Sequence, residues 1–271
     1  MNNTSSVFKN HIESIVVPTL KGGLGNQMFQ ISTAYAYSRD NNISFGINYG
    51  LPTTRVQGNG PETYQDTLYS NIYATSEVPE QTYNEPDFSH SSLPQGTRLI
   101  IDGYFQSPKY FDNYKDSIGD LFTFSDDIKE KVESALSKIP GQKVGVHIRR
   151  GDYKMYSKVH PPCPVSYYES AMNEFSDDAT FIVCTDDIPS FKEEFDVSKF
   201  VLSNGKSELE DLYLLSQCDS VIICNSTFSW WGAYLGNDKE KVIAPASWFG
   251  PDGPKEYEDI YVDSWLRIDN T

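Results

Sequence analysis

Val144-Gly-Val-His-Ile-Arg-Arg-Gly-Asp-Tyr153 is the stretch of this sequence that decides the fold. Its apolar residues Val144, Val146 and Ile148 occupy every second position, which is the period of a β-strand with one face in a core. The strand ends in charge, because two arginines precede a Gly-Asp turn. In open α/β sheets, ligands bind just beyond the carboxyl ends of strands. The pattern therefore predicts a buried strand that leads into a binding loop.

The two arginines of this stretch have the chemistry of a phosphate site. A planar guanidinium offers paired N–H donors that suit a phosphate group. The alternative is that one arginine forms a structural ion pair while the other lies in solvent. The overall charge favours the phosphate site, because the chain carries a formal charge of −16 and yet gathers Arg149, Arg150, Lys154 and Lys158 within ten residues.

The composition excludes several classes of partner. An acidic protein is a poor match for nucleic acid or an anionic membrane. Met1–Asn10 is polar and resembles no signal peptide, and no apolar run approaches the roughly 20 residues of a membrane span. We therefore expect a soluble, cytoplasmic protein. The four cysteines show no metal-type spacing and are predicted to be free thiols: Cys163, Cys184, Cys218 and Cys224.

The second half of the chain alternates strands with helices. Strands are predicted at 144–149, 180–184, 200–202, 220–224 and 241–244, and helices at 166–175, 189–195, 208–217 and 228–235. Repeated β-α-β units predict a doubly wound parallel sheet. In the third helix, Ser207 and Glu210 are predicted to form a capping box.

The first half is less regular. Strands are predicted at 14–20, 43–48 and 98–103, and a glycine loop, Lys21–Gln27, precedes a helix. That loop is either an anion or sugar site or a tight structural turn. Residues 49–96 are predicted to be irregular with a weak helix near 63–73. Their tyrosines form either a sugar platform or the cover of a core: Tyr64, Tyr69, Tyr73 and Tyr83.

A helix at 126–139 stops at Pro140-Gly141, which we take as a domain boundary. The prediction is an α/β protein of two Rossmann-like domains, 1–140 on the acceptor side and 141–271 on the donor side, which face each other across a cleft.

Two more loops follow strands of the second half. Asp186 and Asp187 are predicted either to accept N–H bonds from a purine or to cap the next helix. Ser226 and Thr227 open a helix and offer a phosphate seat, or serve only as N-caps. Trp230 and Trp231 in that helix are predicted to pack in the core.

The sequence gives no sign of a metal site. It contains no Asp-x-Asp triplet, and its only histidines are His11, His90, His147 and His160. Arginines and a helix terminus would then neutralise a diphosphate without a metal.

Four segments, in this order, resemble the α-1,2-fucosyltransferases of glycosyltransferase family 11. They are Gly22-Gly-Leu-Gly-Asn-Gln-Met-Phe-Gln30, Gly103-Tyr-Phe-Gln-Ser107, Val146-His-Ile-Arg-Arg-Gly-Asp-Tyr153 and Asn225-Ser-Thr-Phe-Ser-Trp-Trp-Gly-Ala-Tyr-Leu235. Thr185–Ser190 is similar to the guanine-contacting loop of the α-1,6- and protein O-fucosyltransferases. The resemblance covers residues 14–245.

The resemblance implies a GT-B-like fold and inverting transfer of L-fucose from GDP-β-L-fucose, without an essential metal, to a sugar hydroxyl. The expected product has an α-1,2 link to a β-galactoside-type acceptor glycan. Carried onto this chain, the donor site comprises His147 and Asp186 or Asp187 at guanine, Arg149 at the β-phosphate, Arg150 and Asp152 shaping that loop, Ser226, Thr227 and Phe228 at the phosphates, and Gly23, Gly25, Asn26 and Gln27 from the first domain.

The catalytic base stays open at this point. Inversion asks for a group that accepts the proton of the acceptor hydroxyl, and Asp152 and His160 are both candidates; a dissociative reaction with little base assistance is a third possibility. The alternatives to the whole prediction are a fucosyltransferase of another linkage or acceptor, or a non-catalytic protein that binds a nucleotide sugar or a glycan.

Overall fold

The computed structural model describes residues 12–52, 58–236 and 238–271. Met1–Asn10, where the sequence predicts no signal peptide, lies outside these residues. None of the helices in the described ranges has the length and apolar composition of a membrane span.

The described strands are β1 (Ile15–Pro18), β2 (Ser44–Phe45), β3 (Gln81–Asn84), β4 (Arg98–Asp102), β5 (Lys143–Ile148), β6 (Thr180–Thr185), β7 (Phe200–Leu202), β8 (Ser220–Ile222), β9 (Lys241–Pro245) and β10 (Leu266–Ile268). The α-helices are α1 (Leu24–Asn41), α2 (Lys115–Gly119), α3 (Asp126–Leu136), α4 (Val165–Met172), α5 (Ile188–Glu194), α6 (Glu208–Gln217) and α7 (Thr227–Tyr234). Short 3-10 turns are η1 (Pro61–Tyr64), η2 (Pro108–Tyr110), η3 (Asp112–Tyr114), η4 (Asp152–Lys154), η5 (Val197–Lys199) and η6 (Glu258–Ile260).

The second half forms a six-stranded sheet in the order β10-β9-β8-β5-β6-β7. Every strand pair in it is parallel. Counted from β5, this is the strand order 3-2-1-4-5-6 of a Rossmann sheet, whose order reverses between β5 and β8. Val144–Ile148 is buried along its whole length, as expected for a central parallel strand covered on both faces. The prediction of a doubly wound parallel sheet is confirmed.

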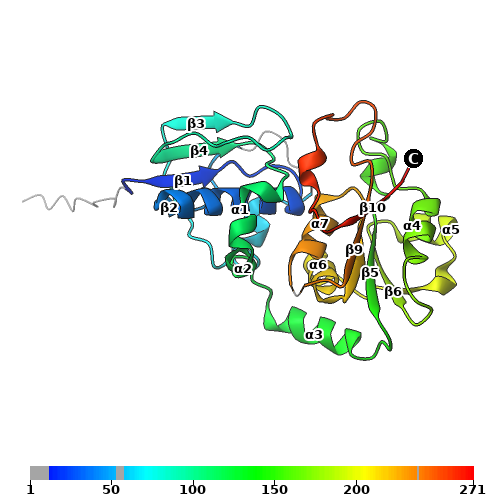
Figure 1. The fold of residues 1–271 in the computed structure, drawn as a ribbon. Helices are drawn as coiled ribbons and strands as arrows, with labels where there is room; N and C mark the ends of the chain where they lie inside the picture. The colour runs from blue at the N-terminus through cyan, green and yellow to red at the C-terminus, as the bar shows by residue number, and fades with distance from the viewer. Residues whose placement is uncertain (1–11, 53–57, 237) are drawn as a thin grey trace, which may run out of the picture.

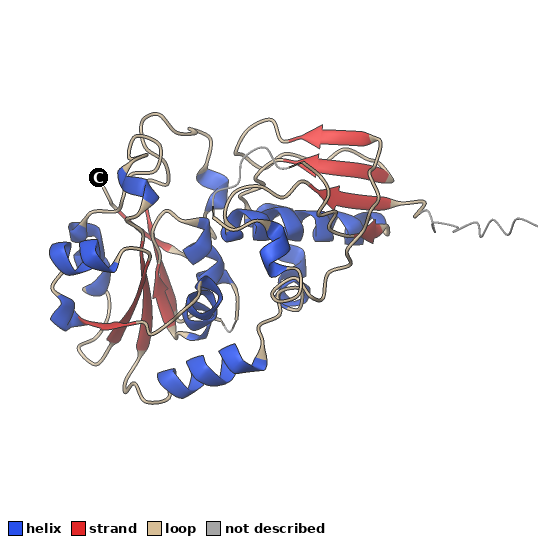
Figure 2. Cartoon of the chain, turned by 180° about the vertical axis from the view of Figure 1, so that it is seen from behind, coloured by secondary structure: helices blue, strands red, loops and turns tan. Residues whose placement is uncertain are grey.

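The first half forms a smaller sheet in the order β2-β1-β4-β3, also entirely parallel. All four residues of β1 are buried, and α1 runs along this sheet (Figure 1). Figure 2 shows the two sheets from behind, with helices between them. α3 runs from one half towards the other and ends before Pro140-Gly141; the domain boundary there remains a prediction.

The two halves share one hydrophobic core where α1 meets α7. Trp230 and Trp231 are fully buried, which confirms that they pack in the core. The Phe29 ring lies 4.5 Å from the ring of Trp230 and 5.2 Å from that of Trp231. Trp231 Nε1 also donates a 2.9 Å hydrogen bond to the Gly25 carbonyl. The packing of these aromatic rings therefore joins the two halves at α1 and α7.

The predictions for residues 49–96 need correction. The segment contains strand β3, whose polar sequence Gln81–Asn84 hides it, and the helix predicted near 63–73 is only the short turn η1 followed by further turns. Its tyrosines form no shared platform: Tyr64 and Tyr69 are buried, whereas Tyr73 is 58% exposed. Strand β10 also escaped prediction, because two of its three residues are exposed.

Candidate functional site

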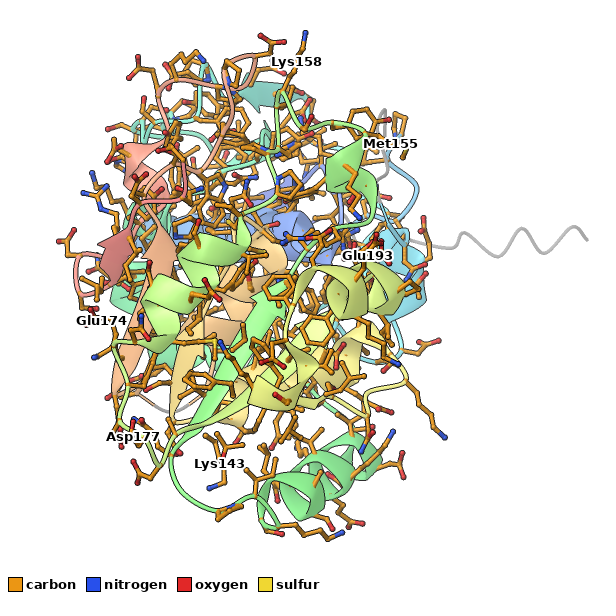
Figure 3. All side chains as sticks on the ribbon, turned by 90° about the vertical axis from the view of Figure 1, so that its right-hand side faces the viewer. Lys143, Met155, Lys158, Glu174, Asp177 and Glu193 are labelled. Atoms are coloured by element: carbon orange, nitrogen blue, oxygen red, sulfur yellow. The ribbon has the colours of Figure 1, made fainter. Side chains whose placement is uncertain are left out.

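A cavity of about 510 Å³ lies between the two halves. The loops that follow β5, β6, β7 and β8 all open into it, which is the position expected at the reversal of strand order. Figure 3 shows Lys143, the first residue of β5, at the opposite end of this sheet from Met155 and Lys158, which follow its carboxyl end. The first half contributes Gly23, Leu24, Gly25, Asn26, Gly58, Phe88, Tyr104 and Gln106 to the lining.

The charged lining groups among the described residues all come from the second half. They are Arg149, Asp152, Asp186, Lys206, Glu208 and Asp211. The cavity is therefore electrostatically one-sided over the part of the chain that the structure describes.

Arg149 lies in the cavity wall, held by two carboxylates. Its Nε donates a 3.0 Å bond to Asp152 Oδ1 and lies 3.0 Å from Asp186 Oδ2, and its Nη2 lies 2.8 Å from Asp152 Oδ1. The nearby Asp186 and Asp152 charges raise the pKa of Arg149 even though burial, the largest influence, opposes this. The guanidinium is thus a permanent cation with a fixed orientation, which suits an anionic ligand group.

Arg150 is not brought to the cavity. Its side chain is buried, its Nε donates a 2.7 Å bond to Glu194, and its guanidinium carbon lies 5.3 Å from the Phe195 ring centroid. Successive residues of an extended chain point to opposite sides, so Arg149 and Arg150 diverge. Arg150 therefore forms the structural ion pair that was the stated alternative for one of the two arginines, and its implied role in shaping the donor loop stays a prediction. Lys154 and Lys158 do not line the cavity either.

His147 is buried at the carboxyl end of β5 and lines the cavity. Its ring lies 5.1 Å from that of Phe228, and its Nδ1 lies 3.3 Å from Cys224 Sγ. Burial, assisted by the Arg149 charge, lowers the pKa of His147 to about 3. His147 is therefore a neutral hydrogen-bonding group beside Arg149.

The two carboxylates after β6 separate in function. Asp186 lines the cavity, and its Oδ1 accepts the Arg150 backbone N–H at 2.9 Å. Asp187 instead caps α5, accepting from the Ser190 N–H at 3.0 Å, and hydrogen bonds from the Ser190 hydroxyl and N–H lower the pKa of Asp187. The capping alternative therefore describes Asp187, and only Asp186 remains at the predicted donor site.

The glycine loop before α1 approaches the second half directly. Gly23, Gly25 and Asn26 line the cavity, whereas Gln27 is buried and its Nε2 donates to the carbonyls of Gly22 and Asn59. A Cβ on Gly25 would lie 2.4 Å from the Thr227 carbonyl carbon. Glycine is required here because the two backbones touch. Gln27 fixes the loop from behind and does not reach the cavity.

The N-terminus of α7 faces the cavity through Ser226, Thr227 and Phe228. The Ser226 side chain makes no capping hydrogen bond to the helix, so it is not simply an N-cap. Backbone N–H groups and the dipole at this end of the helix favour an anion.

His160 and Asp152, the two candidate bases, both line the cavity. Asp152 is paired with Arg149, as described above. The His160 ring stacks on Tyr153 at 5.3 Å, and its buried Nδ1 has no hydrogen-bond partner among the described residues. Burial lowers the pKa of His160, against the opposing Asp152 charge. The neutral imidazole is the form that accepts a proton.

Sequence reasoning missed the loop between β7 and α6. Lys206 and Ser207 line the cavity, and Asp211 shapes the loop by accepting from Ser203 Oγ at 2.6 Å. Ser207 caps α6 as predicted, but Glu210 accepts from the Lys206 N–H rather than closing the predicted box on Ser207. The rule that ligands bind beyond the carboxyl ends of strands also indicates this loop. We did not predict it because Lys206 is the only cation in the loop.

No group of three or more His, Cys, Asp or Glu side chains within the described ranges is placed to hold a metal ion.

Several known proteins are similar to this chain. The model of glycosyl transferase family 11 matches residues 6–269. An α-1,2-colitosyltransferase of Escherichia coli is 30% identical over 94% of this chain and 99% of its own length. The O-antigen biosynthesis glycosyltransferase WbnK of Escherichia coli is 27% identical over 92% of this chain and 99% of its own. Galactoside α-(1,2)-fucosyltransferase 2 of Oryctolagus cuniculus is 27% identical over 91% and 75%.

Among solved structures, the NodZ α-1,6-fucosyltransferase co-crystallised with GDP superposes with a TM-score of 0.56 at 14% identity, covering 83% of this chain and 93% of that one. The fucosyltransferase NodZ from Bradyrhizobium gives 0.57 at 12% identity, over 83% and 94%. These similarities concern the fold, and they confirm the GT-B-like architecture of two Rossmann-like domains.

Proposed function

This chain belongs to glycosyltransferase family 11, and from that premise we propose that it transfers L-fucose from GDP-β-L-fucose to a sugar hydroxyl with inversion, forming an α-1,2 link to a β-galactoside-type acceptor. The observation that carries the proposed donor site is Arg149, a cation fixed by Asp152 and Asp186 that lines the same cavity as the N-terminus of α7. The family and the galactoside fucosyltransferase relatives support the sugar and the linkage.

The GDP moiety occupies the second-half side of the cavity in this proposal. Arg149 and the N-terminus of α7 bind the diphosphate, where both favour negative charge. His147 and Asp186 face the guanine end, and Gly23, Gly25 and Asn26 approach the donor from the first half. We propose no essential metal, because Arg149 and the N-terminus of α7 can stabilise the negative charge that develops on the GDP leaving group.

For the chemical step we propose His160 as the base. As the bond between fucose C1 and the β-phosphate oxygen breaks, its electron pair leaves with GDP, and the acceptor oxygen forms the new bond to C1. The proton of the acceptor hydroxyl passes to the neutral His160 imidazole. Asp152 is the weaker candidate because Arg149 already engages its carboxylate; it holds Arg149 in position.

A second candidate exists for the donor sugar. The relative that is 30% identical is a colitosyltransferase, so GDP-colitose is the competing donor. A fucosyltransferase of another linkage or acceptor is the other alternative.

The test incubates the protein with GDP-fucose or GDP-colitose and a panel of galactosides in EDTA, and follows GDP release. Acceptor-dependent release from GDP-fucose, lost in Arg149→Ala, is the expected result, and product analysis gives linkage and anomeric configuration. Release from GDP-colitose alone would overturn the donor, and absence of GDP binding would overturn the site.

The four cysteines support a further element of this proposal. All are buried free thiols in the structure, and burial raises the pKa of Cys224 to about 11. Such thiols suit a reducing compartment, and we propose that the enzyme works in the cytoplasm; fractionation of the source cells tests this.

A further inference from the structure

A row of rings leads away from Arg149 along the cavity. Its guanidinium lies 5.6 Å from the Tyr153 ring, which stacks on His160. The His160 ring lies 5.4 Å from that of Phe249, and Phe249 lies 5.4 Å from Phe88. All of these residues line the cavity. The row thus connects the cation of the second half to the first half without a gap.

The row ends on Tyr104, whose ring stacks on Phe88 at 5.6 Å and 21°. The next residue, Phe105, has φ +51°, a left-handed conformation that is strained for a non-glycine residue. Glu85 holds this turn by accepting the backbone N–H groups of Tyr104 and Phe105 at 2.6 and 2.9 Å. The turn that lines the cavity at Tyr104 and Gln106 therefore has a strained backbone, as often occurs at functional sites.

A polar group with an unused acceptor lies in the same turn. Gln106 is 6% exposed and lines the cavity, and its Nε2 donates to Asn26 Oδ1 at 2.8 Å. Its buried Oε1 has no partner among the described residues. Buried side-chain acceptors are normally satisfied, so we infer that this oxygen accepts a hydrogen bond from a ligand donor such as a sugar hydroxyl.

Hydrogen bonds and an ion pair hold both ends of this row of rings, one set between the halves and one within the second half. Asp259 of η6 accepts the His90 N–H at 2.8 Å and pairs with Lys109, which anchors the loop carrying Phe88. On the other side, the Gly250 N–H donates to the Val159 carbonyl at 2.9 Å, which places Phe249 beside His160. The rings are therefore preorganised, which reduces the cost of ordering them around a ligand.

We propose that Phe88, Tyr104 and Phe249, with the Gln106 amide, form the acceptor wall: the subsite that binds the acceptor sugar and presents its hydroxyl to His160. This inference rests on the proposed function and names the substrate class of that site. Aromatic walls with a few polar groups suit a ligand with apolar C–H surface and hydroxyls. The four wall side chains carry no charge, and Lys21, whose Nζ lies 5.2 Å from the Tyr104 ring centroid, is paired with Asp102 and does not line the cavity. The wall therefore selects an uncharged hexopyranoside with a C–H face, such as a galactoside, over a sugar acid.

The test measures acceptor KM and kcat for Phe88→Ala and Tyr104→Ala, with GDP affinity and acceptor-independent hydrolysis of GDP-fucose determined in parallel. Burying an aromatic side chain against a ligand corresponds to a change of roughly tenfold or more. The acceptor KM is expected to rise by at least that factor, while GDP affinity and hydrolysis stay within about twofold of wild type. The galacturonic acid analogue of the best galactoside is expected to be a poor acceptor for the wild-type enzyme.

Tyr73→Ala is the matched control, because Tyr73 is an exposed aromatic residue of the same half that does not line the cavity. Phe88→Leu replaces Phe88→Ala if the latter does not fold. An unchanged acceptor KM in folded Phe88 and Tyr104 variants overturns the acceptor wall. Absence of both GDP binding and hydrolysis in the wild type instead overturns the proposed function.

Discussion

The two halves of the molecule share an architecture and differ in chemistry. Each has a parallel sheet whose strand ends meet the cavity, and each directs a loop and the start of a helix, α1 or α7, towards it. Yet among the described residues the second half supplies every charged group of the lining, whereas the first supplies glycines, amides and aromatic rings. The difference teaches that two similar sheets can contribute different chemistry to one cavity: charge comes from the second half alone, whereas aromatic rings come from both.

The contact between α1 and α7 makes the comparison sharper. Gly25 and Thr227 hold corresponding places near the starts of the two helices, and their backbones touch. The first loop uses glycine to permit this approach, and the second uses hydroxyl residues beside the helix dipole. Similar local structure thus permits close packing in one half and, in the proposed function, binds an anion in the other.

The largest expected effect concerns the charge of the second half. Arg149→Ala removes the fixed cation, and the loss of a preorganised group at developing negative charge lowers kcat by about 10²- to 10³-fold. Steady-state GDP release measures this. Arg149→Lys is expected to recover only part of the rate, because an ammonium lacks the paired donors of the guanidinium.

Arg267→Ala is the matched control, since the Arg267 side chain is 45% exposed, contacts Glu258 and the Tyr261 ring, and does not line the cavity. It is expected to leave kcat unchanged. A similar loss in Arg149→Ala and Arg267→Ala would mean that the one-sided charge of the cavity has no catalytic meaning.

The neighbouring arginine tests the comparison through stability. Arg150→Ala leaves Glu194 without its buried partner and removes contacts with Phe195, so we expect the free energy of unfolding to fall by about 2 kcal/mol. Denaturant unfolding measures the loss. GDP affinity of the folded variant is expected to remain within a few-fold of wild type, and a loss comparable to that of Arg149→Ala would return Arg150 to the donor site.

The contrast between these arginines shows how far the sequence could lead. The alternation of Val144, Val146 and Ile148 predicted β5 and its binding loop, and the β-α-β rhythm predicted the second sheet. The sequence did not reveal which arginine faces the cavity. That depends on Glu194 and Phe195, which contact Arg150 only in the folded chain. Asp186 and Asp187 were ambiguous for the same reason.

The first half was harder to predict. Strand β3 is polar and short, so its pairing with β4 leaves no hydrophobic period in the sequence. Phe88 was not recognised as a cavity residue, because its position depends on the contact between His90 and Asp259, which are 169 residues apart. The segment Gly103–Ser107 was recognised as one of the four family segments, whereas the positive φ of Phe105 could not be read from the sequence.

A smaller effect is expected at the contact between the halves. Gly25→Ala forces the Thr227 and Phe228 backbone to move, and overpacking of this kind costs about 1–3 kcal/mol of folding stability. We expect a melting temperature several degrees lower and a weaker affinity for GDP. Gly119→Ala is the control: nothing lies within 4 Å of its added Cβ. Equal behaviour of the two variants would show that the halves do not depend on this contact.

The smallest effect lies at the border between the halves, in the pH dependence of His160. Burial lowers the pKa of His160 from its ordinary value of about 6.5. The neutral, proton-accepting imidazole therefore persists at and above that pH and is lost as the pH falls through the folded pKa. The acceptor kcat/KM is expected to be flat above about pH 6.5 and to fall only at more acidic pH, because burial lowers the pKa of His160. His160→Gln should lower the rate and remove this acid limb. If the limb survives in His160→Gln, a carboxylate carries it, and Asp152, the partner of Arg149, becomes the base; the charged half would then contain both the leaving-group cation and the proton acceptor.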